Sequence, residues 1–210
     1  AVTIPTAGDT ATASILSDEV LSAALTATTQ GNEAGPVNAV YTVTLSAANT
    51  TGSAITFDLD DLGTGTATAG SDYAAIPAAA KISVANGATT GTLAVAVLDD
   101  ALLEPTETVI AKISNPSNAS VTFTTDTATA SILSNETAAA ALSVTTQGNE
   151  AGPVNVVYTV TLSSANNTGA SITFDLVDLG TGTATSGNDY TAIPAAAKIS
   201  VANGATTGTF

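Results

Sequence analysis

The sequence predicts an all-β protein made of tandem antiparallel β-sandwiches of immunoglobulin-like architecture, with about seven strands in each 117-residue unit. Two observations lead to this fold class. Apolar and polar residues alternate with period two over short stretches, which is typical of strands buried on one face. Long segments also return at one fixed spacing, which indicates a tandem array of domain-sized units.

The repeat is carried by three segments, each found twice. The string GTATAGSDY at 65–73 returns as GTATSGNDY at 182–190, which is 117 positions later (182 − 65). QGNE at 30–33 returns at 147–150, and DTATASILS at 9–17 returns unchanged at 126–134. All three pairs share one register, so one unit is repeated.

The repeat divides the chain into three parts. Residues 1–19 match the terminal strand of a preceding repeat, residues 20–136 form one complete repeat, and residues 137–210 match the first part of the next. We interpret the chain as a segment of a longer repetitive polypeptide. The junctions at 17–19 and 134–136 are short and contain neither Gly nor Pro, which favours a stiff rod over a flexible string.

Within the complete repeat, the alternation predicts the strands in order. They are expected at 23–28, 39–46, 55–60, 82–84, 93–97, 109–113 and 128–132. A turn at 49–52, a Gly-rich connection at 61–77 and an acidic loop at 99–105 separate them. Asn86-Gly87 accepts positive φ and suggests a tight hairpin between the strands on either side of it.

Composition limits the function classes. The chain has 18 acidic and 3 basic residues and no His or Cys. Nucleic acid and anionic membrane surfaces are therefore poor partners, because both are bound through basic patches. A disulfide framework is excluded, and no apolar run is long enough to span a membrane. Without His, Cys or Arg the usual bases, nucleophiles and anion clamps are missing, so we do not expect an enzyme.

One combination of motifs resembles the Calx-beta domain. It consists of GTATAGSDY at 65–73, NGATTGT at 86–92, VAVLDD at 95–100 and EPTE at 104–107. The resemblance implies a β-sandwich that binds Ca²⁺ through loops at one end. It also implies an extracellular location, because this composition fits the very large bacterial surface proteins of the family.

The resemblance also implies a ligand set. Its members are Glu33, Asp72, Asp99, Asp100 and Glu104 in the complete repeat, and Glu150 and Asp189 in the next copy. Many relatives carry an acidic residue just before the Gly-rich string, where this chain has Thr64. Asp61 is the candidate that would replace it if the loop bulges.

The residues support the same site independently. Hairpin returns would bring Glu33, Asp72 and the 99–104 loop to one end of the sandwich, where carboxylates without Arg or Lys repel one another. Ca²⁺ prefers such oxygen ligands and would remove the repulsion. The competing interpretation is that these are ordinary solvated loop acids, with Asp72 capping its own turn.

These observations predict a structural repeat segment of a long extracellular bacterial surface adhesin or filament, stiffened by calcium. Its partners would be the neighbouring repeats. Two alternatives remain open: a recognition module whose loops bind a glycan or protein, and a subunit that exchanges strands with other copies of itself in an extracellular fibre. The two copies are identical at 59 of 74 aligned positions, which favours a spacer because recognition loops tend to diverge.

Overall fold

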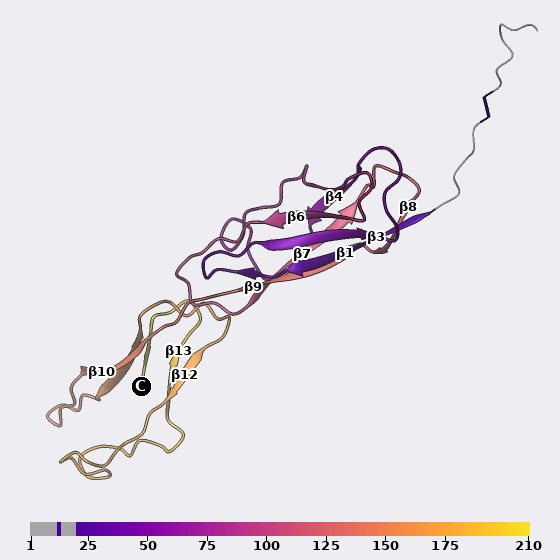
Figure 1. The fold of residues 1–210 in the computed structure, drawn as a ribbon. Helices are drawn as coiled ribbons and strands as arrows, with labels where there is room; N and C mark the ends of the chain where they lie inside the picture. Colours follow the sequence, from indigo (N-terminus) through magenta and orange to yellow (C-terminus); the bar gives the residue numbers. More distant parts are fainter. Residues whose placement is uncertain (1–11, 14–19) are drawn as a thin grey trace, which may run out of the picture.

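The computed structural model describes residues 12–13 and 20–210. In this part of the chain the regular structure is β-sheet throughout, and fourteen strands form four sheets (Figure 1). The strands of residues 20–136 and those of residues 137–210 lie in different sheets and enclose separate apolar clusters. We call these parts the first unit and the second unit. No helix with the length and apolarity needed to cross a bilayer occurs in the described segments.

The first unit is a sandwich of two sheets, with strand orders β6-β3-β1-β8 and β2-β9-β7-β4-β5. Its strands are β1 Leu21–Thr29, β2 Gly31–Asn32, β3 Ala39–Leu45, β4 Ile55–Asp61, β5 Lys81–Val84, β6 Thr90–Val95, β7 Glu107–Ser114, β8 Val121–Thr125 and β9 Thr127–Leu133. The predicted all-β sandwich is confirmed.

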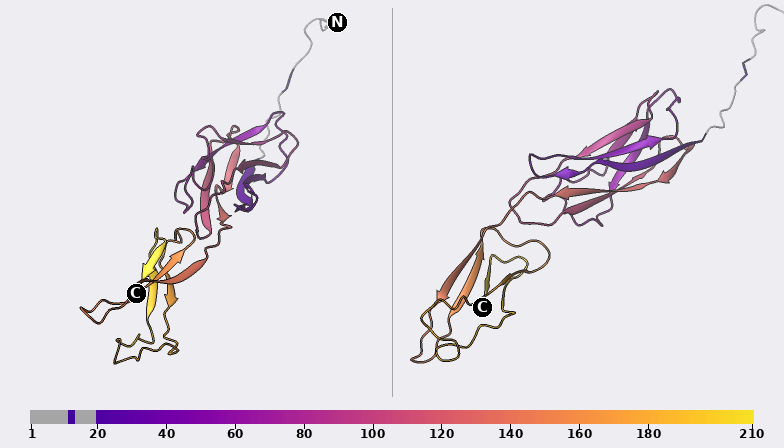
Figure 2. Two further views of the ribbon diagram at one scale, coloured as in Figure 1. Left: turned by 90° about the vertical axis from the view of Figure 1, so that its left-hand side faces the viewer. Right: turned by 60° about the horizontal axis from the view of Figure 1, so that its bottom comes forward.

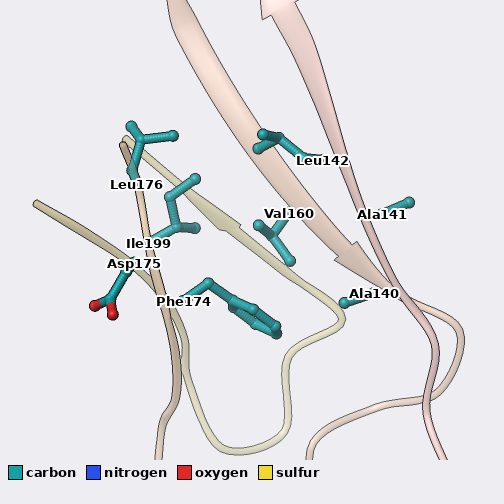
Figure 3. A pocket seen from close by; sticks show the side chains of 8 residues that line it. All are labelled: Ala140, Ala141, Leu142, Val160, Phe174, Asp175, Leu176 and Ile199. Carbon is teal, nitrogen blue, oxygen red and sulfur yellow. The ribbon is translucent and has the colours of Figure 1, made fainter. Parts of the chain in front are cut away.

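The second unit repeats part of this arrangement. Its strands are β10 Ala140–Thr146, β11 Val157–Leu162, β12 Ile172–Asp175, β13 Lys198–Val201 and β14 Thr207–Thr209. They form the sheets β10-β11-β14 and β12-β13, which match β1-β3-β6 and β4-β5 of the first unit. Between the two sheets, Val160, Phe174 and Ile199 help to line an apolar pocket of about 190 Å³ (Figure 3).

The core of the first unit follows the alternation in the sequence. Every second side chain of β3 and β4 is buried, with Tyr41, Val43 and Phe57 fully covered. The Tyr41 hydroxyl also donates a hydrogen bond of 2.8 Å to the backbone carbonyl of Val109. Because β3 and β7 belong to different sheets, this bond ties the two layers of the sandwich together.

Two strands of the first unit were not predicted. β2 has only two residues and pairs in parallel with β9, while β8 pairs in parallel with β1. β8 buries only Val121, so it lacks the alternation that reveals the other strands. These two pairs are parallel, whereas the other strand pairs of the first unit are antiparallel as expected. The terminal strand expected within residues 1–19 lies outside the described residues, apart from 12–13.

The hairpin predicted at Asn86-Gly87 was also wrong. Gly87 does adopt a positive φ of 84°. However, β5 pairs with β4 in one sheet and β6 pairs with β3 in the other. The turn therefore carries the chain from one layer of the sandwich to the other, because neighbouring strands in sequence need not pair.

The connection between β4 and β5 is fixed by a close backbone approach at Gly65. A Cβ added there would lie 2.1 Å from the Thr108 carbonyl oxygen on β7. The Ala67 amide donates a 3.0 Å hydrogen bond to that same oxygen. Gly65 therefore allows the Gly-rich segment to lie directly on the sheet.

We expect Gly65→Ala to destabilise the first unit by about 1–3 kcal/mol, the usual cost of overpacking a close contact. The matched control is Gly182→Ala, the same position of the second unit, where an added Cβ meets no atom within 4 Å. Urea unfolding of both variants checks this. Equal midpoints for the two variants would contradict the close approach.

Candidate metal centre

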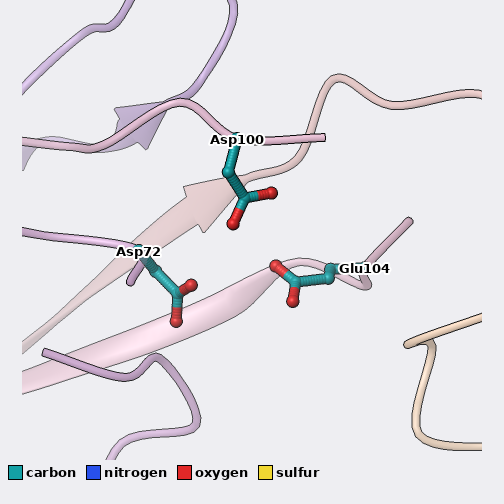
Figure 4. A group of neighbouring side chains, drawn as sticks. All are labelled: Asp72, Asp100 and Glu104. Atoms are coloured by element: carbon teal, nitrogen blue, oxygen red, sulfur yellow. The ribbon is translucent and has the colours of Figure 1, made fainter. Parts of the chain in front are cut away.

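Acidic side chains from several connections meet at one end of the first unit. Asp72 belongs to the Gly-rich connection, and Asp100 and Glu104 belong to the loop between β6 and β7. One carboxylate oxygen of each lies within 4.8 Å of the other two. Figure 4 shows the three side chains converging, Asp72 from one connection and Asp100 and Glu104 from the other. We call these three residues the acidic cluster.

Local hydrogen bonds hold Asp72 in place. Its backbone amide donates to the Thr68 carbonyl at 3.0 Å, and the Thr68 amide donates back to the Asp72 carboxylate. Its own carbonyl accepts from the Leu98 amide at 2.9 Å, just before the acidic loop. The side chain is 4% exposed. Asp72 does cap its own turn, as the competing interpretation expected, but it is buried while doing so.

Glu33 is the most unusual acid of the site. It follows β2, where its amide donates a 3.0 Å hydrogen bond to the Leu133 carbonyl of β9. The residue is only 2% exposed, and its Oε2 atom has no hydrogen-bond partner among the described residues. A buried carboxylate oxygen without a donor is costly. A cation beside this acceptor would remove that cost.

The pKa values reflect the same crowding. Burial raises the pKa of Glu33 to about 7, and the neighbouring Glu136 carboxyl adds to the rise. Burial and the Asp72 carboxyl raise the pKa of Glu107 to about 8, and burial and Asp72 also raise the pKa of Glu104. Burial and neighbouring negative charges both disfavour the charged form of a carboxyl group. These acids therefore ionise less readily in the folded chain than in the unfolded chain.

No lysine relieves this repulsion. Lys81 pairs with Asp58 on β5 and β4, and Lys112 pairs with Asp126 at 3.2 Å. These are the two lysines of the first unit, and the chain contains no Arg or His. The charged side chains gathered at the site are therefore carboxylates. Such hard oxygen donors suit Ca²⁺, which takes ~6–8 oxygen ligands in flexible geometry.

The structure separates the predicted site residues into groups. Asp72, Asp100 and Glu104 form the acidic cluster, and Glu33 adjoins it, since Asp100 and Glu104 both raise its pKa. Asp99 is exposed and its carboxylate accepts a 3.2 Å hydrogen bond from the Asn135 side chain. The assignment of these residues as ligands stays a prediction.

Asp61 is engaged elsewhere. One carboxylate oxygen accepts from the Gly63 amide at 2.9 Å and the other accepts from the Tyr73 hydroxyl. It is not a member of the acidic cluster. In the second unit, Asp178 repeats both bonds with Gly180 and Tyr190. The repetition indicates that this aspartate orders the Gly-rich connection.

The second unit shows no cluster of its own among the described residues. Glu150 and Asp189 are exposed, and the second unit as given has no counterpart of the 99–107 loop. Asp189 repeats the turn of Asp72, because its carboxylate accepts from the Thr185 amide at 2.6 Å. The local turn therefore forms from its own sequence, whereas the cluster depends on the loop that supplies the other acids.

Sequence reasoning missed two acids of the site. Glu107 lies at the start of β7, beside Asp72. Glu136 lies in the segment between the units, where its carboxylate accepts from the Ser134 hydroxyl at 2.6 Å. In the sequence, Glu107 resembles an ordinary residue at the start of a strand, and Glu136 resembles a residue of the linker between repeats. The spacing Glu104-x-x-Glu107 was a signal for Glu107. The signal for Glu136 was an acid three residues after the end of β9.

The comparison with known protein families also points to calcium binding. The sequence profile of the Calx-beta domain matches residues 18–136 and 141–207. The chain belongs to the Calx-beta domain family. Calx-beta domains are calcium-binding modules, and the acidic cluster supplies donors for such an ion. The cofactor predicted from the sequence, Ca²⁺, is thus the ion that fits both the family and the donor set.

Three solved structures are similar to this Calx-beta chain. The apo form of the Calx CBD1 domain has 21% identity and a TM-score of 0.44, over 56% of this chain and 99% of that one. CBD12 of CALX1.2 has 19% identity and a TM-score of 0.43, over 89% and 73%. The calcium binding domain CBD12 of CALX1.1 has 18% identity and a TM-score of 0.42, over 88% and 73%. No protein with a curated description matches the chain.

The raised pKa values predict how stability depends on pH when calcium is removed. Glu33 and Glu107 have a higher pKa in the folded state than their usual value of 4.5, so the folded chain holds protons that the unfolded chain releases. The free energy of unfolding should therefore fall as pH rises from about 5 to about 8. Urea unfolding in chelator at both ends of this window tests it. A flat profile would contradict the crowding.

Replacing Glu33 by Gln removes the buried charge and keeps the shape. We expect Glu33→Gln to stabilise the chelated protein at pH 8 by on the order of 1–3 kcal/mol, since one pKa unit is worth about 1.4 kcal/mol. The same variant should gain less stability from added Ca²⁺ than the parent chain. The matched control is Glu150→Gln, at the exposed equivalent position, which should change neither value.

Proposed function

We propose that this chain is a structural repeat segment of a long extracellular bacterial surface adhesin or filament, and that calcium stiffens it. Residues 20–136 would be one complete repeat, residues 137–210 part of the next, and residues 1–19 the terminal strand of a preceding one. The partners of each repeat would then be its neighbours in the same chain. The proposal rests on the connection between the acidic site and the second unit.

One contact carries the argument for stiffening. Leu103 lies between Asp100 and Glu104, and its carbonyl accepts a 3.0 Å hydrogen bond from the Asn167 amide of the second unit. Glu136 and Asn135, in the segment that joins the units, also face this site, through Glu33 and Asp99. An ion that orders the acidic loop would therefore restrain the loop, the joining segment and the neighbouring unit together.

Three further points support a structural spacer in an extracellular protein. The second unit repeats the first with mild changes, as a spacer requires. The family occurs in extracellular and lumenal proteins, and the strongly acidic composition suits a surface protein. The acids of the site crowd together without a His, Cys or Arg that would act as base, nucleophile or anion clamp, so we propose a module that binds calcium and does not catalyse a reaction.

Strand exchange is the second candidate, and one observation favours it. Leu142 on β10 is 58% exposed, whereas its equivalent Leu25 on β1 is 1% exposed. In the first unit β1 packs against β9, whose sequence recurs at residues 9–17. The N-terminal segment of another copy would then cover β10. Concentration-dependent mass in sedimentation equilibrium would support exchange, and a constant monomer mass would rule it out.

Calcium should narrow the distribution of distances between the two units. The chain has no Cys. Thr90→Cys and Thr191→Cys, at exposed positions of the first and second unit, would therefore be the two sites at which thiol-reactive fluorophores attach. Single-molecule energy transfer should give a broad distribution in chelator and a narrow one in Ca²⁺. Asp100→Asn in the same background should keep the distribution broad. Equal widths with and without Ca²⁺ in the parent chain would contradict stiffening.

A further inference from the structure

The contact between the units involves a well-defined turn. The second unit follows the first end to end, and the turn of residues 164–168 lies at its near end (Figure 2). Leu103 and Asn166 form an isolated parallel bridge, and the Asn167 amide donates to the Leu103 carbonyl. We call residues 164–168 the docking turn of the second unit.

A fully buried asparagine builds this turn. The Asn166 side-chain amide donates to the carbonyls of Ala170 and Val201 at 2.8 and 3.0 Å. Its side-chain oxygen accepts from the Thr168 amide and hydroxyl at 3.2 and 2.7 Å. All polar atoms of the side chain are thus used within the second unit. The backbone amide of Asn167 donates to the neighbouring unit instead.

The first unit contains the same turn at residues 47–51. The Asn49 side-chain amide donates to the carbonyls of Ser53 and Val84 at 2.8 and 3.0 Å. Its oxygen accepts from the Thr51 amide and hydroxyl at 3.1 and 2.7 Å. These four distances repeat those of Asn166 to within 0.2 Å. The turn therefore forms in this shape whether or not a neighbour covers it.

The two turns differ in what covers them. Residues 164, 165, 167 and 168 are partly buried, whereas their equivalents 47, 48, 50 and 51 are all exposed. The Thr50 amide, which corresponds to the donor of Asn167, has no acceptor among the described residues. The turn carries no charge, so an acidic loop can approach it without repulsion. The first unit thus presents an uncovered copy of a surface that the second unit uses.

We propose that residues 47–51 are the docking surface for the acidic loop of a preceding repeat of this type in the same polypeptide. The carbonyl of the residue that stands in place of Leu103 would accept from the Thr50 amide. The segment Ser17-Asp18-Glu19 before the first unit matches Ser134-Asn135-Glu136 in length, so a preceding repeat would be tethered as the second unit is. The contact joins one end of a unit to the other end of the next, and such heterologous contacts build open arrays.

This inference rests on the proposed function only in treating the chain as one of tandem repeats. It does not need calcium. The contact is made by backbone atoms, which explains why Thr50 replaces Asn167 at the donor position without loss. It also gives the array a direction, because the acidic loop and the docking turn lie at opposite ends of the unit.

Amide hydrogen exchange at Thr50 tests the proposal. The chain is lengthened at its N-terminus by a copy of its own residues 20–117, so that residues 1–19 complete a repeat in register. In the 210-residue chain, the Asn167 amide should exchange slowly and the Thr50 amide at least tenfold faster. In the lengthened chain, Thr50 should become as protected as Asn167.

A variant at the docking turn provides the control. Ala48 is exposed, so Ala48→Asp should leave the melting temperature unchanged while repelling an acidic loop. In the lengthened chain it should return Thr50 to fast exchange and leave Asn167 protected. Fast exchange of the Thr50 amide in the lengthened parent chain would overturn the proposal. So would a protection of Thr50 in the 210-residue chain that increases with protein concentration, because a second molecule would then be the occupant. A failed calcium response would affect the stiffening proposal alone.

Discussion

The first unit is constrained by a set of buried and half-buried carboxylates that no lysine of the described residues neutralises. Glu33 is almost fully covered and its Oε2 atom has no donor in the described part of the chain, while Asp72, Asp100 and Glu104 converge close by. Burial of uncompensated acids costs free energy, and the raised pKa values of Glu33 and Glu107 express that cost. A bound divalent cation would turn this repulsion into attraction. The stability of the unit and the order of its loops are then linked to the same ion.

The position of these acids connects the site with the neighbouring unit. They lie at the end of the sandwich that faces the next unit. The acidic loop, the joining segment and the docking turn of the second unit meet there through hydrogen bonds of Leu103 and Asn135. A stalk built from such units would be rigid where calcium is present and more flexible where it is scarce.

The sequence predicted the strands with clear alternation, such as β3 and β4, because each buries every second side chain in one core. It did not reveal β8, whose single buried residue leaves no pattern, or the change of sheet at Asn86-Gly87, which depends on long-range pairing. For the site, the resemblance to the Calx-beta domain suggested Asp72, Asp100 and Glu104 as ligands, and the structure brings their carboxylates together. It overlooked Glu136, because only the folded chain brings the end of β9 back beside Glu33.

The most direct test of the account is the location of calcium in crystals of this chain grown with Ca²⁺. Anomalous scattering should show a peak at the end of the first unit, between Glu33, Asp72, Asp100 and Glu104, with Glu107 or Glu136 at its edge. Crystals of the Glu33→Gln variant should show a weaker peak there. A well-ordered first unit without a peak at this end, or with peaks only at exposed acids such as Asp60, would contradict the account.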